Sequence, residues 1–155
     1  MKVLDNVTVV IVDCVNQGKA IAAINKTLEQ ITPAMTLFFT DVYIDVPNAD
    51  CVIIEKITSK NGYSDFMMKK LSPYISTEFV LVIQHDGFPI NSECWTDEFF
   101  NYDYIGARWN YPETERCVGN GGCSLRSYKL IDLLAHDPFI EITDQEDDCI
   151  ARLYG

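Results

Sequence analysis

The sequence predicts an α/β fold in which a mainly parallel central sheet is covered by helices on both faces. Short apolar runs alternate with segments of helical periodicity along the first half of the chain, an order typical of β-α-β units. The first run, VTVVIV at 7–12, is also β-branched throughout, as expected for a short strand buried on both faces.

The elements are expected in the following order. Strands are predicted at 7–12, 35–40, 51–57 and 79–83. A helix is predicted from Gln17 to Ile31, because isoleucine and leucine recur there at intervals of three and four residues and Pro33 follows. Asn61 is expected to cap a second helix that closes near Pro73.

Composition bounds the class of protein. The length of 155 residues and the hydrophobic content of 48% predict a single domain over 1–155 with a full core. The net charge of −11 opposes binding to nucleic acid or to anionic membranes. No apolar run reaches the ~20 residues of a membrane span, and the start of the chain does not resemble a signal peptide. A cytoplasmic protein with reduced cysteines is therefore expected.

Three aspartates follow predicted strands. Asp13, Asp41 and Asp86 each come at or just after the end of an apolar run. Any one of them fits an ordinary turn residue. Ligands in parallel sheets bind beyond the carboxyl ends of the strands, so three aspartates on that edge favour a cleft.

A glycine-rich segment, VGNGGCSLRS at 118–127, occupies the second half of the chain. Glycines let a backbone approach a ligand closely, and Ser124 could cap a following helix whose free N–H groups attract anions. The alternative is a tight strand-to-helix turn without a ligand. The pattern is neither a Walker loop nor a dinucleotide fingerprint.

An acidic cluster follows in TDQEDDCIARLYG at 143–155. A capping box between Thr143 and Glu146 would explain Glu146, but it leaves Asp147 and Asp148 unexplained. Acidic residues are favoured in the first turn of a helix, so a surface cap remains open. The same field would keep Asp147 ionised and able to accept a proton.

Four segments together carry a family resemblance: IQHDGFPIN, EFFNYDYIGARW, VGNGGCSLRS and EDDCIAR, in that order. They resemble a family of microbial and phage proteins with a GT-A-type glycosyltransferase fold. The last two are also similar to the glycine-rich and Glu-Asp-Asp elements of β-1,4-galactosyltransferases. The resemblance implies a three-layer sandwich that uses a nucleotide-diphosphate sugar.

The resemblance also implies a divalent metal, manganese or magnesium, held by an Asp-x-Asp motif at the end of a strand. Asp86 matches the second carboxylate of that motif, whereas Gln84 stands in place of the first. His85 between them could be a ligand, a donor contact or a packing residue. Because a diphosphate entering an acidic rim needs a cation, either a metal or an arginine must neutralise it; Arg108, Arg126 and Arg152 are the candidates.

The expected reaction is transfer of a sugar to an acceptor hydroxyl with inversion. The resemblance makes Asp147 the base, with Glu146 beside it as a second catalytic candidate. The expected donor-binding residues are Asp13, Asp41, Gln84, His85, Asp86, Gly121 and Gly122. The expected sugar or acceptor contacts are Trp109, Asn120 and Asp148.

Other readings remain open. One is a binding protein of the same fold that holds a nucleotide or nucleotide sugar without transferring it, since the Asp-x-Asp motif is incomplete. Another is glycosylation of modified bases in phage DNA, against which the acidic charge counts. An unrelated phosphotransfer or hydrolytic enzyme lacks its usual motifs here. The acceptor is open, and a second copy of the chain could complete the cleft.

Overall fold

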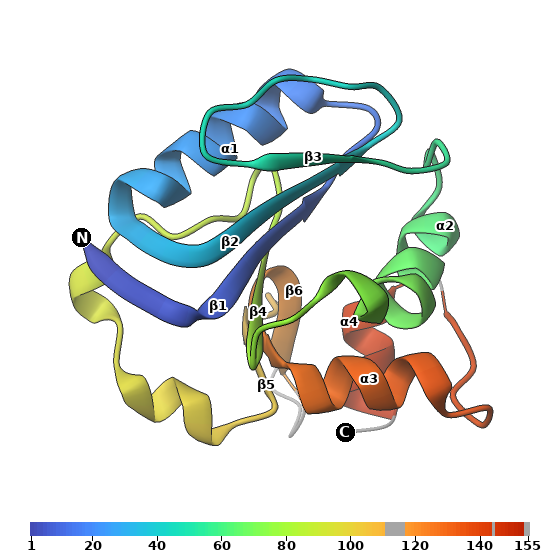
Figure 1. The fold of residues 1–155 in the computed structure, drawn as a ribbon. Coiled ribbons are helices and arrows are strands. Elements are labelled where there is room, and N and C mark those ends of the chain that lie inside the picture. The colour runs from blue at the N-terminus through green and yellow to red at the C-terminus, as the bar shows by residue number, and fades with distance from the viewer. Residues whose placement is uncertain (111–116, 144, 154–155) are drawn as a thin grey trace.

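The computed structural model of the chain describes residues 1–110, 117–143 and 145–153; Figure 1 shows the fold as a ribbon. The strands are β1 (Lys2–Val12), β2 (Ile31–Thr40), β3 (Asp50–Ile53), β4 (Phe79–Ile83), β5 (Tyr104–Arg108) and β6 (Val118–Ser127). The α-helices are α1 (Gln17–Gln30), α2 (Lys60–Asp65), α3 (Tyr128–His136) and α4 (Glu146–Asp148). Two of them continue as π-helical turns, α2 through Phe66–Lys70 and α4 through Cys149–Leu153.

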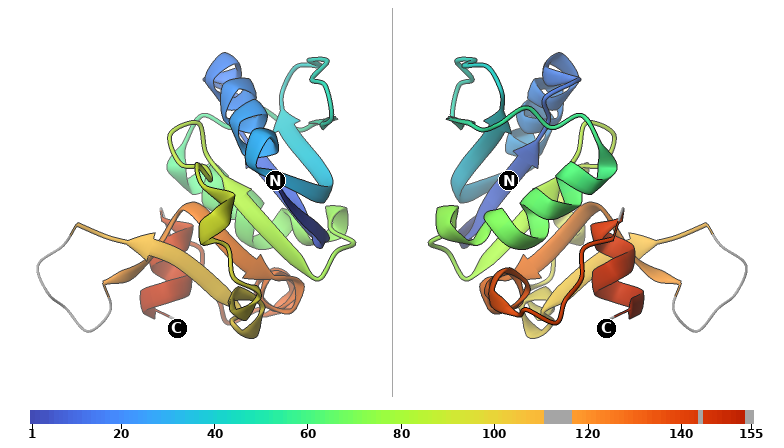
Figure 2. Two further views of the ribbon diagram at one scale, coloured as in Figure 1. Left: turned by 90° about the vertical axis from the view of Figure 1, so that its left-hand side faces the viewer. Right: turned by 90° about the vertical axis from the view of Figure 1, so that its right-hand side faces the viewer.

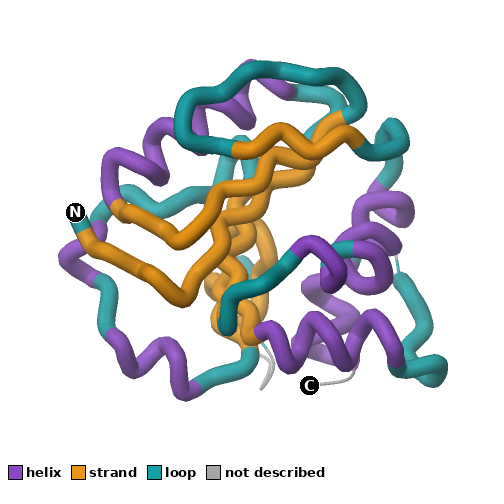
Figure 3. Tube along the Cα trace, in the orientation of Figure 1, coloured by secondary structure: helices purple, strands orange, loops and turns teal. Residues whose placement is uncertain are grey.

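The six strands form one mixed sheet in the order β3-β2-β1-β4-β6-β5. β1 pairs in parallel with β2 and β4, and β2 with β3. β6 is antiparallel to both β4 and β5. The α/β class expected from the sequence is therefore confirmed, and Figure 3 shows the strands running through the middle of the molecule with helices around them.

Alternate residues of the central strands supply two apolar cores, one on each face. On one face Val9, Ile11 and Leu81 pack with α1. On the other, Val10 and Val82 pack with the π-helical turn after α2 and with α3. Side chains alternate across a strand, which explains why an uninterrupted apolar run in β1 fills both cores; Figure 2 shows the sheet from its two sides.

The ends of the helices differ in detail from the predictions. α1 ends at Gln30, and its C-cap residue Ile31 is already extended and begins β2. Pro33 lies within β2 rather than terminating the helix, and it pairs with Leu4 at the edge of a register irregularity, where a missing backbone N–H is tolerated. The cap of α2 is Ser59, not Asn61, because the Ser59 hydroxyl accepts from the Gly62 N–H at 3.0 Å.

The glycine-rich segment is the largest departure. It is strand β6 rather than a turn, and the cap of α3 is Ser127, whose hydroxyl accepts from the Leu130 N–H at 3.1 Å. Two of the residues that face β6 have to be glycines. A Cβ on Gly106 would lie 2.6 Å from the Asn120 carbonyl oxygen. A Cβ on Gly87 would lie 2.5 Å from the Gly122 carbonyl oxygen. The backbones of the turn after β4 and of the adjacent strand β5 thus lie in close contact with the backbone of β6.

All six cysteines lie within the described residues and are free thiols. In the described part of the chain, no helix combines the length and apolar character that crossing a membrane would require.

Candidate functional site

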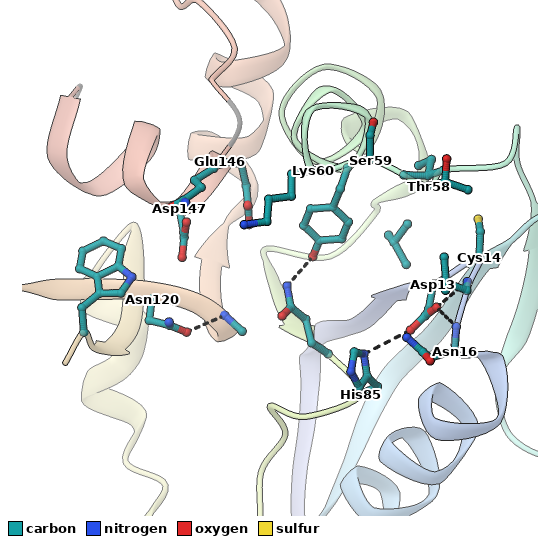
Figure 4. Close-up of a pocket in the computed structure, with 18 residues that line it drawn as sticks. Asp13, Cys14, Asn16, Thr58, Ser59, Lys60, His85, Asn120, Glu146 and Asp147 are labelled. Carbon is teal, nitrogen blue, oxygen red and sulfur yellow. Dashed lines mark hydrogen bonds and ion pairs between the residues drawn. The ribbon is translucent and has the colours of Figure 1, made fainter. Parts of the chain in front are cut away.

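A pocket of about 590 Å³ opens at the carboxyl ends of β1 and β4. The loop after β1 and the turn after β4 form one side, the start of α2 another, and β6 with α4 the third, as the labelled side chains in Figure 4 show. The lining residues lie at 12–16, 57–60, 63, 84–85, 109, 120, 122 and 145–147. Segments from both ends of the chain therefore share one cavity, as the ligand rule for parallel sheets predicts.

Asp13 is fixed in this pocket by its own loop. Its Oδ1 accepts from the backbone N–H of Val15 at 2.8 Å and of Asn16 at 2.5 Å. Its Oδ2 lies 3.4 Å from Nδ1 of His85, and the Asp13 side chain is 10% exposed. The carboxylate therefore serves first to shape the β1 loop and to orient the imidazole.

Asp41 does not line the pocket. It accepts from Nε2 of Gln17 at 3.2 Å and pairs with Lys56 at 3.6 Å. It still influences the wall, because burial first and then the charge of Asp41 raise the pKa of the Cys14 thiol. Asp41, which was expected to contact the donor, is thus engaged with residues outside the pocket lining.

The turn after β4 separates the three residues that were grouped as a motif. Gln84 and Gly87 close the turn with two backbone hydrogen bonds, of 2.8 and 3.1 Å, and Asp86 is exposed at its tip. Gln84 and His85 line the pocket, whereas Asp86 does not. The Gln84 amide donates to the Tyr63 hydroxyl at 3.2 Å, and burial raises the pKa of that hydroxyl.

The residues named for a divalent metal do not fit one. Asp86 lies outside the pocket lining, and Gln84 uses its amide to hold Tyr63. Within the described residues, no group of three or more histidine, cysteine, aspartate or glutamate side chains is arranged to hold a metal ion. Mg²⁺ and its relatives prefer several oxygen ligands around one point, and Asp13 and Asp147 come from different walls of the pocket.

The glycines of β6 build the wall opposite Asp13. Asn120 and Gly122 line the pocket, and the Asn120 side chain accepts from the Gly122 N–H at 3.0 Å. Gly121 lies behind that surface, where its N–H donates to Oδ2 of Asp147 at 2.9 Å. A Cβ on Gly121 would lie 2.9 Å from both the Asp147 Cβ and Oε1 of Glu146, so only glycine lets α4 dock here.

Glu146 lines the pocket but is buried and already engaged. Nη2 of Arg126 lies 2.9 Å from its Oε1, and the two side chains are 1% and 7% exposed. Burial alone would lower the pKa of Arg126, but Tyr104 and Glu146 outweigh burial and raise it, so the guanidinium stays charged. Arg126 is therefore not a phosphate ligand. No capping box forms between Thr143 and Glu146, because the N-cap position of α4 is Gln145, which makes no side-chain cap hydrogen bond.

Asp147 and Trp109 both line the pocket, as expected, and Asp148 does not. The Asp147 carboxylate is held by two backbone N–H groups, those of Gly121 and Asp148, at 2.9 and 2.8 Å. Asp148 instead pairs with Arg152 at 3.1 Å. The Trp109 ring is buried, and it packs close to Gly119, whose φ of 141° is suited to glycine.

Sequence reasoning missed the contribution of the segment that leads into α2 and of the first turn of α2. Thr58, Ser59, Lys60 and Tyr63 line the pocket, and Lys60 is exposed. No motif marks these residues. One signal was available: the segment follows β3, which runs parallel to β2, so it must emerge on the same edge of the sheet as the loops after β1 and β4.

Comparison with known families gives one match. The profile of the family described as "Protein of unknown function (DUF5672)" covers residues 49–149, more than half of the chain. The chain therefore belongs to this family. The matched range contains β4, β6 and the Glu-Asp-Asp segment but ends two residues after Asp147. No curated protein matches the chain.

Proposed function

We propose that the protein is a glycosyltransferase with a GT-A-like fold that transfers a sugar from a nucleotide-diphosphate sugar to an acceptor hydroxyl. One observation carries the proposal: Asp13, His85, Asn120, Gly122 and Asp147, from four separate segments, line one pocket at the carboxyl ends of parallel strands. All four segments carry residues that the sequence predicts for donor binding, sugar contact or catalysis. The pocket volume of about 590 Å³ lies in the range of pockets that bind small molecules such as a nucleotide-diphosphate sugar.

In the proposed reaction the nucleoside lies near Asp13 and the sugar lies against the wall of β6. The acceptor oxygen forms a bond to the anomeric carbon while the bond from that carbon to the diphosphate oxygen breaks. The nucleoside diphosphate leaves with the electron pair, and the proton of the acceptor hydroxyl moves to Asp147. One direct displacement of this kind inverts the anomeric configuration.

Asp147 is suited to the role of base because the described residues orient its carboxylate without placing a cation against it. Its partners among the described residues are two backbone N–H groups, which fix the orientation of the carboxylate and carry no formal charge. The neighbouring cation, Arg126, pairs with Glu146 instead. We therefore assign Glu146 a positioning role: its ion pair anchors α4, and α4 carries Asp147.

The experiment that tests the proposal is release of nucleoside diphosphate from a panel of nucleotide-diphosphate sugars, followed by chromatography with simple sugars or water as acceptor. Asp147→Asn should lower turnover by about 10²–10⁴-fold, while leaving the affinity for the donor within about twofold. Asp5→Asn, an identical change at an exposed position in β1, is the matched control. Equal turnover in the wild type and Asp147→Asn would remove Asp147 from the mechanism.

A second candidate is a binding protein that holds the nucleotide sugar without turnover. It is favoured by the position of Asp86, which is exposed and does not line the pocket. Saturable donor binding, with no release of nucleoside diphosphate from any donor tried, would select this alternative over the transferase.

A further inference from the structure

A nucleotide-diphosphate sugar brings roughly two negative charges into a pocket that is itself acidic. Among the described residues, three carboxylates line it: Asp13, Glu146 and Asp147. Glu146 is compensated by the buried Arg126, and Asp13 is held by two backbone N–H groups and by His85. Asp147 has backbone partners but no cation within ion-pair distance among the described side chains. The diphosphate therefore needs a positive charge of its own.

The arginines expected to supply that charge do not line the pocket. Arg126 is 1% exposed and faces Glu146. Arg152 pairs with Asp148, and Arg108 is exposed at the end of β5. The segment that was expected to bind a metal does not fit one, as described above. Both expected sources of positive charge are thus absent from the lining.

Lys60 remains. Among the lining residues that the structure describes, it is the one lysine or arginine. It begins α2 directly after the cap residue Ser59, and in Figure 4 its side chain extends into the pocket toward the wall formed by α4. Within the described residues its amine makes no ion pair shorter than 4.0 Å, whereas Lys56 and Lys70, on either side of it in the sequence, are paired with Asp41 and Asp65.

We propose that Lys60 binds the diphosphate of the donor, so that this pocket takes a nucleoside diphosphate without a divalent metal. The inference rests on the proposed function. It assigns to the Lys60 amine the role of neutralising the diphosphate, which a divalent metal was expected to have. The lysine would attract the donor on entry and would stabilise the additional charge on the diphosphate when the bond to the sugar breaks. Because the Lys60 amine has no ion-pair partner among the described side chains, none of the described ion pairs has to be broken first.

The test is calorimetric titration with UDP, GDP, ADP, CDP and dTDP, each with a chelator and again with MnCl₂. We expect at least one nucleoside diphosphate to bind in chelator, with a dissociation constant that changes less than about threefold on addition of manganese. Lys60→Gln should weaken that binding about tenfold or more, since a hydrogen bond to a charged group is involved. Lys60→Arg should restore most of it.

Lys129→Gln is the matched control, because Lys129 is 85% exposed on α3 and lies outside the lining; its affinity should equal that of the wild type. Binding that appears only with manganese would overturn the inference and leave the proposed function standing. Unchanged affinity in Lys60→Gln, with a normal melting temperature, would also overturn it. If neither a nucleoside diphosphate nor its sugar conjugate binds under either condition, the proposed function fails as well.

Discussion

Arg126 and Glu146 form a buried ion pair of 2.9 Å, with side-chain exposures of 1% and 7%. The pair joins the sheet to α4, because Arg126 lies in β6 and Glu146 begins the short helix. Nε of Arg126 also donates to the Ser124 hydroxyl at 3.1 Å, and the guanidinium lies over the Tyr104 ring. The position of Asp147, the next residue in the chain, depends on this anchor.

Removing one partner of the pair should destabilise the fold. Glu146→Leu or Arg126→Met leaves a buried charge uncompensated, which typically costs about 3–5 kcal/mol. The double variant Arg126→Met/Glu146→Leu should be more stable than the sum of the two single changes predicts. Urea unfolding of all four proteins measures this coupling. Single variants that stay within about 0.5 kcal/mol of the wild type would contradict a structural role for the pair.

Gly121→Ala should displace α4 from β6. The added Cβ would lie 2.9 Å from Oε1 of Glu146 and from the Asp147 Cβ, and 3.1 Å from Nη2 of Arg126. Overpacking of this kind costs about 1–3 kcal/mol, and turnover should fall further because the N–H that holds Asp147 moves. Gly18→Ala is the control, since a Cβ there meets nothing within 4 Å and alanine favours a helix. Comparable unfolding free energies for the two variants would refute the packing argument.

Stability should decrease in alkaline solution, in part because of Cys123. Burial raises the pKa of this thiol from 9.0 to about 11. The unfolded chain therefore loses its thiol proton at lower pH than the folded one, so this contribution is intact below pH 9 and is lost as the pH rises toward 11. Unfolding free energies measured at pH 8 and pH 10.5 should fall less in Cys123→Ala than in the wild type. An equal fall in both proteins would show that the thiol does not contribute.

The class of the fold could be predicted from the sequence because the apolar runs carry the information locally. The run at 7–12 is uninterrupted in apolar or β-branched residues and forms the second half of β1, which begins already at Lys2. β4 has the bounds expected for it. The segment 118–127 could not be predicted as a strand from its own residues, because glycine has low strand propensity. Its strand conformation depends on close contacts with Gly106 and Gly87, which are distant in the sequence.

The candidate site was predicted in outline but not in its charges. Asp13, His85 and Asp147 share the pocket as the sequence suggested. Arg126 was one of three candidate cations for the diphosphate, and a sequence does not tell which of them a later helix covers; here Glu146 of α4 pairs with Arg126. Lys60 was overlooked because a lone lysine at a helix start has no signature, and only the parallel order of β3, β2 and β1 brings it to the site.

The most direct test of the central claim is a thermal-shift panel of nucleotide-diphosphate sugars, measured with chelator and with manganese. A ligand at about 100 times its dissociation constant stabilises the folded state by about 2.7 kcal/mol, which corresponds to about 5–10 °C for a chain of this size. The account predicts such a rise for one class of nucleotide sugar. No rise in the melting temperature for any donor, under either condition and at millimolar concentration, would contradict it.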